Sequence, residues 1–112
     1  MDLELMQVNA TRASELMKLL GHAHRLMILC ELNQGERSVG ELSERVGINQ
    51  SPLSQHLARM RHEGVVQSRR EAQTVYYSLA GSEVAAVISL LYELYCAPAE
   101  AASEQANGKP SR

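Results

Sequence analysis

Hydrophobic spacing along the first third of the chain predicts two helices. Residues 3 to 20 carry apolar side chains at alternating three- and four-residue steps, which is typical of one helix face, and Gly21 can end that helix. A second helix is expected from His22 to about Asn33, followed by a polar, glycine-containing turn at 34–37. The stripe of the first helix comprises Leu3, Met6, Ala10, Ala13, Met17 and Leu20.

Two short amphipathic segments come next, at residues 39–46 and 51–63, with residues 48–50 between them. Ser51 is expected to be the N-cap of the second segment, and Pro52 fits the first helical position because it lacks the N–H that would be unpaired there. Two helices joined by so short a connection predict a helix-turn-helix. The stripe predicted to be buried in its second helix is Leu53, Leu57 and Met60.

The period then changes from helical to alternating. Residues 65–70 and 74–79 are rich in β-branched and aromatic side chains and are separated by residues 71–73, which predicts a β-hairpin. A last helix is expected to start at Ser82 as N-cap and to end at Pro98. Its predicted buried stripe is Val84, Val87, Ile88, Leu91 and Tyr95.

The predicted fold is mostly α with a β-hairpin wing, in the order α-α-α-α-β-β-α. A helix-turn-helix followed directly by a hairpin is a winged helix-turn-helix, in which one helix fits the major groove of DNA and the hairpin reaches the flanking backbone. Residues 1–98 are expected to form this single domain. Residues 99–112, dominated by Ala, Ser, Glu, Gln, Gly and Pro, are expected to be a disordered tail.

Composition excludes several protein classes. The chain has 112 residues, of which 45% are hydrophobic and 21% charged, as in a soluble globular domain, and we expect it to be cytoplasmic. It contains no apolar run of the roughly 18 residues that a membrane span needs, and no signal-peptide pattern, so no membrane partner is expected. Two cysteines are too few for a disulfide scaffold.

The net charge of −2 argues against a nucleic-acid partner until its distribution is examined. Over residues 49–79, four arginines oppose two glutamates, which gives 4 − 2 = +2. The rest of the chain holds seven basic and eleven acidic residues, or −4. The basic charge is therefore concentrated on the predicted reading helix and wing.

Polar side chains opposite the buried stripe are the candidate DNA contacts. Serine and glutamine pair with base edges or phosphates, and arginine pairs with phosphates or guanine. An ordinary solvated helix face is the competing interpretation, and His56, beside the stripe, either orders the helix or touches DNA. The candidates are Gln50, Ser51, Ser54, Gln55, His56, Arg59 and Arg61 on the helix, with Arg69, Arg70 and Gln73 on the wing.

The motif Ser51-Pro52-Leu53-Ser54-Gln55-His56-Leu57, with Ser38-Val39-Gly40-Glu41-Leu42 before it and Arg61-His62-Glu63-Gly64-Val65-Val66 after it, resembles the ArsR/SmtB family of bacterial transcriptional repressors. The stretch 71–77 is similar to that family's wing, and the resemblance spans about residues 12–97. It implies a homodimer through the first and last helices that binds double-stranded operator DNA with two-fold symmetry.

Metal-sensing members of that family carry ligands that are missing at the matching positions here. Residues 39–46 contain no cysteine or histidine, and residues 82–97 contain no histidine. His22 and His24 are two positions apart and, on one helix, would face different sides. We therefore predict neither a metal site nor a cofactor.

Two cysteines remain, Cys30 in the second helix and Cys96 at the end of the last. Both thiols could be inert packing, and Cys30 lies on an apolar helix face, which favours that interpretation for it alone. Their flanking sequences look like the branch of the family that senses sulfide, persulfides or oxidants with one cysteine from each of these helices. That resemblance implies a dithiol switch, with reactive sulfur species or oxidants as inducers.

Three functional hypotheses follow. The leading one is a repressor whose operator affinity falls when Cys30 and Cys96 join through a disulfide or polysulfide. The alternative is a regulator that acts constitutively, or by displacing another repressor, with structural cysteines. A third, a thiol oxidoreductase, is disfavoured because the chain has no Cys-x-x-Cys motif and no βαβ pattern, so we do not expect an enzyme.

Overall fold

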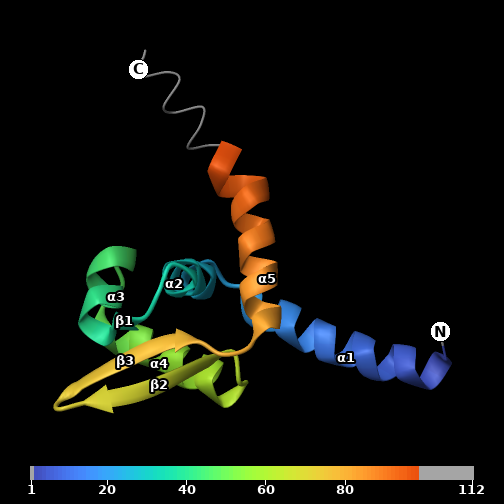
Figure 1. Ribbon diagram of the computed structural model, residues 1–112, viewed down its shortest axis with the longest axis horizontal. Helices are drawn as coiled ribbons and strands as arrows, with labels where there is room; N and C mark the ends of the chain where they lie inside the picture. Colours follow the sequence, from blue (N-terminus) through green and yellow to red (C-terminus); the bar gives the residue numbers. More distant parts are fainter. Residues whose placement is uncertain (1, 99–112) are drawn as a thin grey trace.

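The computed structural model describes residues 2 to 98, and the tail predicted at 99–112 lies outside the described residues. Helices and strands follow the predicted order, with additions at two places (Figure 1). The elements are α1 (Leu3–Leu20), α2 (Ala23–Asn33), β1 (Arg37–Ser38), α3 (Val39–Val46), α4 (Gln50–His62), β2 (Val66–Glu71), β3 (Thr74–Leu79), α5 (Ser82–Leu91) and the π-helix η1 (Tyr92–Cys96).

The sheet has one strand more than the predicted hairpin. Arg37, which we expected in a turn, pairs with Tyr77, and Ser38 pairs with Tyr76, so the strand order is β1-β3-β2 with antiparallel neighbours throughout. Two residues are too few to show an alternating pattern, and for this reason the sequence concealed β1. The extra strand anchors the base of the wing to the residues just before α3.

The expected N-caps of two helices are wrong by one or two positions. Ser51 is the second residue of α4, whose N-cap is Asn49, and Ser82 is the first residue of α5, whose N-cap is Gly81. Gly81 has a φ of +88°, a conformation that glycine adopts without a steric penalty. His22 is not in a helix either: it is the extended N-cap of α2, and its Nδ1 accepts a hydrogen bond from the His24 N–H.

Helix α3 begins with a complete capping box. The Ser38 hydroxyl accepts a hydrogen bond from the backbone N–H of Glu41, and the Glu41 carboxylate accepts one from the backbone N–H of Ser38. These bonds satisfy two N–H groups that have no partner within the helix. They also hold the pKa of Glu41 below its ordinary value.

We expect Ser38→Ala to lower the free energy of unfolding by about 1 kcal/mol, the usual cost of removing an N-cap. Urea denaturation monitored by circular dichroism measures the change. Ser82→Ala is the matched control, because Ser82 was expected from sequence to be a cap and is not one; its effect should stay within about 0.5 kcal/mol. Equal losses in the two variants would contradict the capping role of Ser38.

The core lies between α2, α3, α4 and α5. The predicted stripe of α4 is confirmed, since Leu53, Leu57 and Met60 are fully buried. Ile28 and Leu29 of α2 pack into the same cluster. It is completed by Leu19, Leu20, Leu32, Leu42, Val46, Ile48, Val66, Val84 and Ile88.

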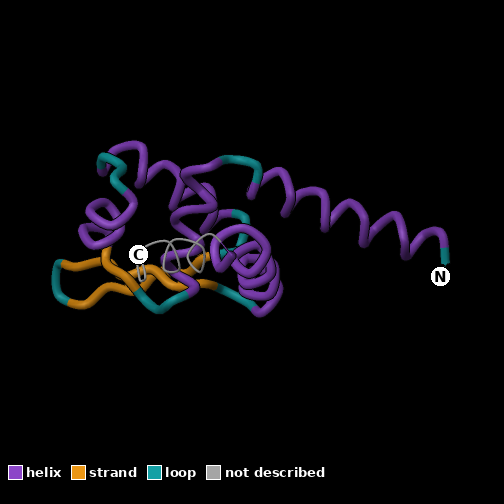
Figure 2. Tube along the Cα trace, turned by 90° about the horizontal axis from the view of Figure 1, so that it is seen from above, coloured by secondary structure: helices purple, strands orange, loops and turns teal. Residues whose placement is uncertain are grey.

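Most of the apolar stripe predicted on helix α1 is exposed in this chain. Leu3 and Met17 are 65% and 71% exposed, and within α1 only Leu19 and Leu20 are buried. The helix leaves the body of the protein at its C-terminal end and extends away from it (Figures 1 and 2). The pattern identified an amphipathic helix correctly, but its apolar face has no partner within the described part of this chain.

Apolar side chains are exposed at the end of the last helix as well. Tyr95, predicted to be buried, is 73% exposed, and Leu90 and Leu94 are also exposed. The chain remains helical through Pro98, the last described residue, so the predicted end of the helix there is untested. Across residues 2 to 98, no helix combines the length and the apolar character needed to cross a membrane.

Candidate DNA-reading surface and cysteine pair

Helix α4 separates its residues cleanly into two faces. Leu53, Leu57 and Met60 hold it on the core, and Ser54, Gln55 and Arg59 point outward and are exposed. Gln50 and Ser51 are exposed in its first turn. The side chains predicted to read base edges are therefore presented together on one side of a helix of 13 residues.

Arg61 lies near the C-terminal end of α4 and reaches the wing. Its guanidinium donates a hydrogen bond to the Ser68 hydroxyl of β2 over 3.3 Å. Arg59, Arg61 and His62 all lie in the last turn of α4, where positive charge interacts favourably with the helix dipole. Among the described residues, Arg59 has no ion-pair partner, and it remains a candidate for phosphate contact.

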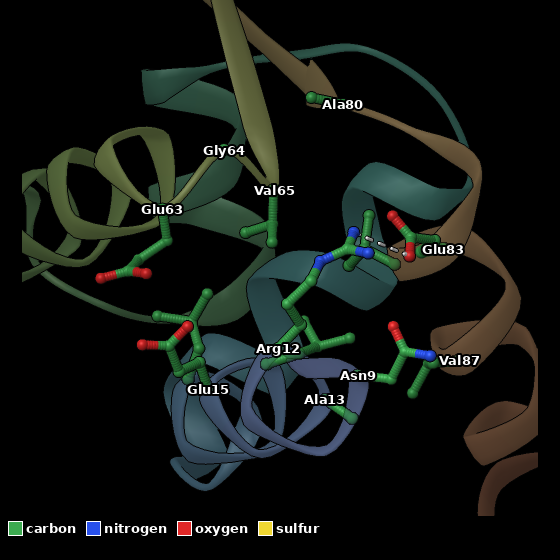
Figure 3. A pocket seen from close by; sticks show the side chains of 13 residues that line it. Asn9, Arg12, Ala13, Glu15, Glu63, Gly64, Val65, Ala80, Glu83 and Val87 are labelled. Carbon is green, nitrogen blue, oxygen red and sulfur yellow. Dashed lines mark ion pairs between the residues drawn. The ribbon is translucent and has the colours of Figure 1, made fainter. Parts of the chain in front are cut away.

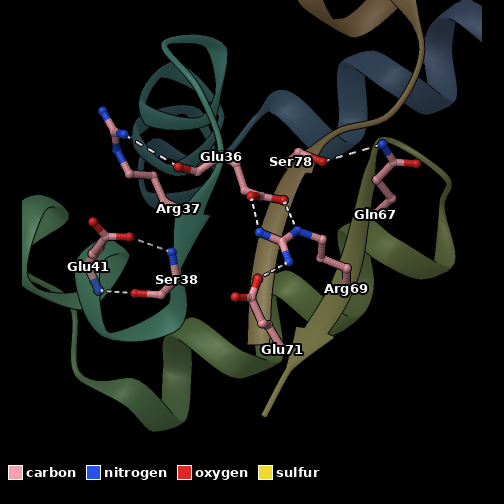
Figure 4. A network of polar contacts seen from close by, with 8 residues as sticks. All are labelled: Glu36, Arg37, Ser38, Glu41, Gln67, Arg69, Glu71 and Ser78. Carbon is pink, nitrogen blue, oxygen red and sulfur yellow. Dashed lines mark hydrogen bonds and ion pairs between the residues drawn. The ribbon is translucent and has the colours of Figure 1, made fainter. Parts of the chain in front are cut away.

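Arg69 is not the free wing cation that we expected. Its guanidinium makes two hydrogen bonds of 2.8 Å to the Glu36 carboxylate and one of 2.7 Å to Glu71 (Figure 4). It also lies 4.6 Å from the centre of the Tyr76 ring. These carboxylates raise the pKa of Arg69 and satisfy most of its donors. Arg69 therefore ties the wing to the residues before β1. Phosphate contact by Arg69 or Arg70 stays a prediction.

The wing ends in a tight turn at Ala72 and Gln73. Glu71 pairs with Thr74, so only these two residues form the loop, and Ala72 has a φ of +56°. Arg70 and Gln73 are both exposed next to this turn. The structure thus places the two remaining predicted wing contacts together at the end of the hairpin.

His56 sits differently from its neighbours on α4. It is half-buried, and its ring lies 4.7 Å from the ring of His22 in an edge-on arrangement. Burial lowers the pKa of His56 first, and the charges of His22, Arg25 and His24 lower it further. This packing accords with a role in placing α4 against the start of α2, and DNA contact by His56 stays a prediction.

Cys30 lies half-buried on α2 beside a small cavity of about 220 Å³ between α2 and the end of the last helix. Burial raises the pKa of the Cys30 thiol, and the negative charges of Cys96 and Glu31 raise it further. Cys96 is exposed and is the last residue of η1. The cavity is lined by Cys30, Asn33, Gln34, Ile88 and Tyr92.

The residues around Cys30 were not found by sequence reasoning. The Asn33 amide donates a hydrogen bond to the Ser89 hydroxyl over 3.1 Å, which connects α2 to α5 across 56 positions of sequence. The π-helix at Tyr92–Cys96 was also missed, because nothing in its composition distinguishes it from α-helix. Such π-turns are uncommon and are found frequently at functional sites.

The two thiols should differ in reactivity. The variant Cys30→Ser keeps only Cys96, and the variant Cys96→Ser keeps only Cys30. At pH 7, the first should react with iodoacetamide several times faster than the second, because Cys96 is exposed and Cys30 is held as the neutral thiol. A raised pKa means that the thiolate forms only at higher pH. The Cys30 rate should therefore still be increasing above pH 9.0, the ordinary value of its pKa, and a plateau below that pH would contradict this assignment.

A second hollow, of about 510 Å³, lies where α1 leaves the body, between α1, the α4–β2 connection and the start of α5 (Figure 3). Arg12 and Glu83 form an ion pair of 3.6 Å across it, and both side chains are largely exposed. An exposed pair of this kind contributes little to stability. None of the lining residues is Ser, Thr, Cys, His or Lys, so the hollow itself offers no side-chain nucleophile of those kinds.

Comparison with known proteins bears on this architecture. Residues 22–68, which span α2 to the start of the wing, match the family model of bacterial regulatory proteins of the arsR family. The transcriptional activator HlyU of Vibrio cholerae is 51% identical over 86% of this chain and 89% of its own length. The chain belongs to the ArsR family. It is accordingly a DNA-binding transcriptional regulator, as predicted.

Other similar proteins share the fold and most of their length with this ArsR-family chain. The biofilm growth-associated repressor of Agrobacterium fabrum is 46% identical over 88% of this chain and 84% of its own. The structure of reduced HlyU superposes with a TM-score of 0.81, at 51% identity, over 84% of this chain and 99% of that one. A homodimeric winged helix-turn-helix domain from Mycobacterium bovis, 29% identical over 93% of each chain, superposes with a TM-score of 0.72.

Proposed function

We propose that this ArsR-family regulator binds a two-fold symmetric operator as a homodimer, and that a bond between Cys30 and Cys96 lowers its operator affinity. Reactive sulfur species or oxidants would form that bond, as a disulfide or a polysulfide. The observation that carries the switch is the cavity between α2 and the end of the last helix, with Cys30 in its wall and Cys96 close enough for its charge to raise the pKa of Cys30.

Unpartnered apolar surface supports the homodimer. Helix α1 exposes Leu3, Leu5 and Met17, and the last helix exposes Leu94 and Tyr95. A projecting helix with so little burial is marginal in water, and several large apolar side chains exposed on one helix favour an interaction surface there. A second copy of the chain, offering the same α1 and α5 surfaces, would cover both, and the similar domain from Mycobacterium bovis is homodimeric.

The bond-forming chemistry begins at the accessible thiol. The Cys96 thiolate attacks the terminal sulfur of an organic persulfide, R–S–SH, so that a new sulfur–sulfur bond forms and R–S⁻ leaves. The Cys30 thiolate then attacks Sγ of the Cys96 persulfide and expels HS⁻. The sum is two thiols and R–S–SH giving one disulfide, R–SH and H₂S, so the persulfide is the oxidant. Further sulfur transfer before the second attack would give a polysulfide bridge, which tolerates a longer gap between the cysteines.

Bridging the cysteines acts on DNA binding through the dimer. Cys96 is the last residue of η1, which follows directly on α5, and Cys30 belongs to α2, which packs on the core that carries α4. A bond between them alters how the last helix is held, and with it the separation of the two α4 helices. The two α4 helices of the dimer must match half-sites about 34 Å apart. A modest reorientation of these helices therefore weakens binding at both half-sites.

We expect treatment of the dimer with an inorganic polysulfide to weaken operator binding severalfold, as measured by fluorescence anisotropy, and dithiothreitol to restore it. Cys30→Ser and Cys96→Ser should bind the untreated operator normally and keep that affinity after treatment. Mass spectrometry distinguishes the bridges, because a disulfide removes two hydrogens and a polysulfide adds sulfur. If both single variants lose operator affinity at the polysulfide concentration that weakens binding by the wild-type protein, the switch is refuted.

The burial of Cys30 favours one alternative, a constitutive regulator in which this thiol is only packing. In that case polysulfide would modify Cys96 alone and leave operator affinity unchanged. The direction of regulation is a separate question, since one similar protein is named an activator and another a repressor. Expression of the controlled genes in a deletion strain would decide it.

A further inference from the structure

Three of the four histidines of the chain gather at one place that neither the DNA-reading surface nor the cysteine pair uses. His22 precedes α2, His24 lies in its first turn, and His56 comes from the middle of α4. Their ring centres are separated by 4.7 Å for His22 and His56, 5.4 Å for His22 and His24, and 6.0 Å for His24 and His56. One nitrogen from each ring lies within 4.8 Å of one nitrogen of the other two.

The sequence argument against this site assumed that His22 and His24 share a helix. Two helical residues two positions apart face different sides, but His22 is the extended N-cap, with a φ of −147°, so that argument does not apply. The third ring, His56, arrives from a part of the chain 34 positions later, which no local pattern reveals. The cluster is therefore a product of the packing of α2 against α4.

Three imidazoles in this arrangement suit a late first-row transition metal. Zn²⁺ binds histidine nitrogen at about 2.0–2.1 Å, often with three protein ligands and an open fourth position, and imidazole also suits Cu²⁺, Ni²⁺ and Co²⁺. Ligand nitrogens around such an ion lie roughly 3.4 Å apart for tetrahedral geometry. His22 and His24 are exposed and His56 is half-buried, so small rotations of the two exposed rings can close the triangle.

The charges around the cluster have one effect that favours metal binding and one that opposes it. Burial of His56 and the charges of His22, Arg25 and His24 lower the pKa of His56, which favours the neutral imidazole that a metal ion requires. The Arg25 guanidinium opposes a bound cation. It is buried, however, and donates its hydrogen bonds to the carbonyl oxygens of Leu19 and Lys18 at the end of α1.

One existing hydrogen bond must be given up for the metal. His22 Nδ1 accepts from the His24 N–H over 3.1 Å, and therefore carries no proton there. Coordination through Nδ1 displaces this bond directly, and coordination of the neutral ring through Nε2 moves the remaining proton to Nδ1, which then cannot accept. A bound ion thus exchanges the N-cap of α2 for a link from the start of α2 to α4.

We propose that His22, His24 and His56 form a site for one divalent late transition-metal ion per chain, with the fourth coordination position open to water or an added ligand. This site is separate from the Cys30–Cys96 switch and does not depend on it. Because His56 lies next to Gln55 on α4, the ion would fasten the reading helix to the start of α2.

The test uses the full-length chain without an affinity tag, after treatment with EDTA, in a Cys30→Ser/Cys96→Ser background that removes thiol ligands. Co²⁺ titration followed by its visible absorption reports a site of low coordination number, and competition between Zn²⁺ binding and a chromophoric chelator gives the affinity. We expect one ion per chain. His22→Ala, His24→Ala and His56→Gln should each weaken Zn²⁺ binding at least about tenfold, as losing part of a metal site does.

His62→Ala is the matched control, because His62 is the fourth histidine, lies exposed on the same helix as His56, and is outside the cluster. Its Zn²⁺ affinity should stay within about twofold of the parent, a change too small to count as a ligand. Circular dichroism of His56→Gln checks the fold, and the exposed His22 and His24 provide variants that leave the core intact. Failure to bind Zn²⁺ or Co²⁺, or equal affinities in all four histidine variants, would overturn the proposal.

Discussion

Gln55→Ala should weaken operator binding by roughly 1–3 kcal/mol at each half-site, and therefore by at least about tenfold for the dimer, because one good side-chain contact to a base edge is worth this much. Gln55 is exposed on the outer face of α4, whose opposite face is fixed in the core by Leu53, Leu57 and Met60. Nothing within the described chain requires its amide, so the fold should not change. Fluorescence anisotropy at a stated salt concentration measures the loss.

Gln67→Ala is the matched control for this experiment. Gln67 is also exposed, but it lies at the base of β2 and not on α4, and its amide donates to the Ser78 hydroxyl over 3.3 Å. Operator affinity should change by less than about threefold, as for surface substitutions in general. If the two glutamine variants lose affinity equally, α4 is not the reading helix in the way we describe.

Leu57→Ala should lower the free energy of unfolding by about 3–5 kcal/mol, because a fully buried leucine loses both its transfer free energy and the contacts around the cavity that it leaves. Leu57 lies at the centre of α4, so the loss falls on the element that carries the reading residues. Urea denaturation should be compared at one protein concentration, since the stability of a dimer depends on it.

Leu57→Met separates cavity formation from simple replacement. Methionine nearly conserves the volume of leucine, and swaps of this kind usually cost less than about 1.5 kcal/mol. A similar loss for alanine and methionine would show that shape at this position matters more than volume. A small loss for both variants would contradict the central place of Leu57 in the core.

The order of elements and the reading face could be predicted from the sequence because both are set by local physics. Helical spacing of apolar residues predicted the buried stripe of α4, and alternation predicted β2 and β3, each with ends within about two residues. Ser54, Gln55 and Arg59 follow directly from that stripe, since residues opposite a buried face are exposed. The predicted winged helix-turn-helix connected those residues to DNA, and the family resemblance added the two-fold symmetric operator.

Tertiary structure decided which distant residues meet, and this changed the roles of particular side chains. Arg69 pairs with Glu36 across 33 positions, so a predicted DNA contact also anchors the wing. The stripe of α1 predicted an amphipathic helix but not what covers its apolar face, because a period identifies an apolar face and not the surface that packs on it. Tyr95 was misassigned for the same reason.

By itself, the sequence determined the winged helix-turn-helix, its reading helix and the presence of only two cysteines. Only the tertiary structure placed Cys30 in the wall of a cavity near Cys96 and brought His56 to His22 and His24. Periodicity and capping act over a few neighbouring residues, whereas a site built from two or three helices depends on how those helices pack. Packing is a property of the whole core, and no short stretch of the chain encodes it alone.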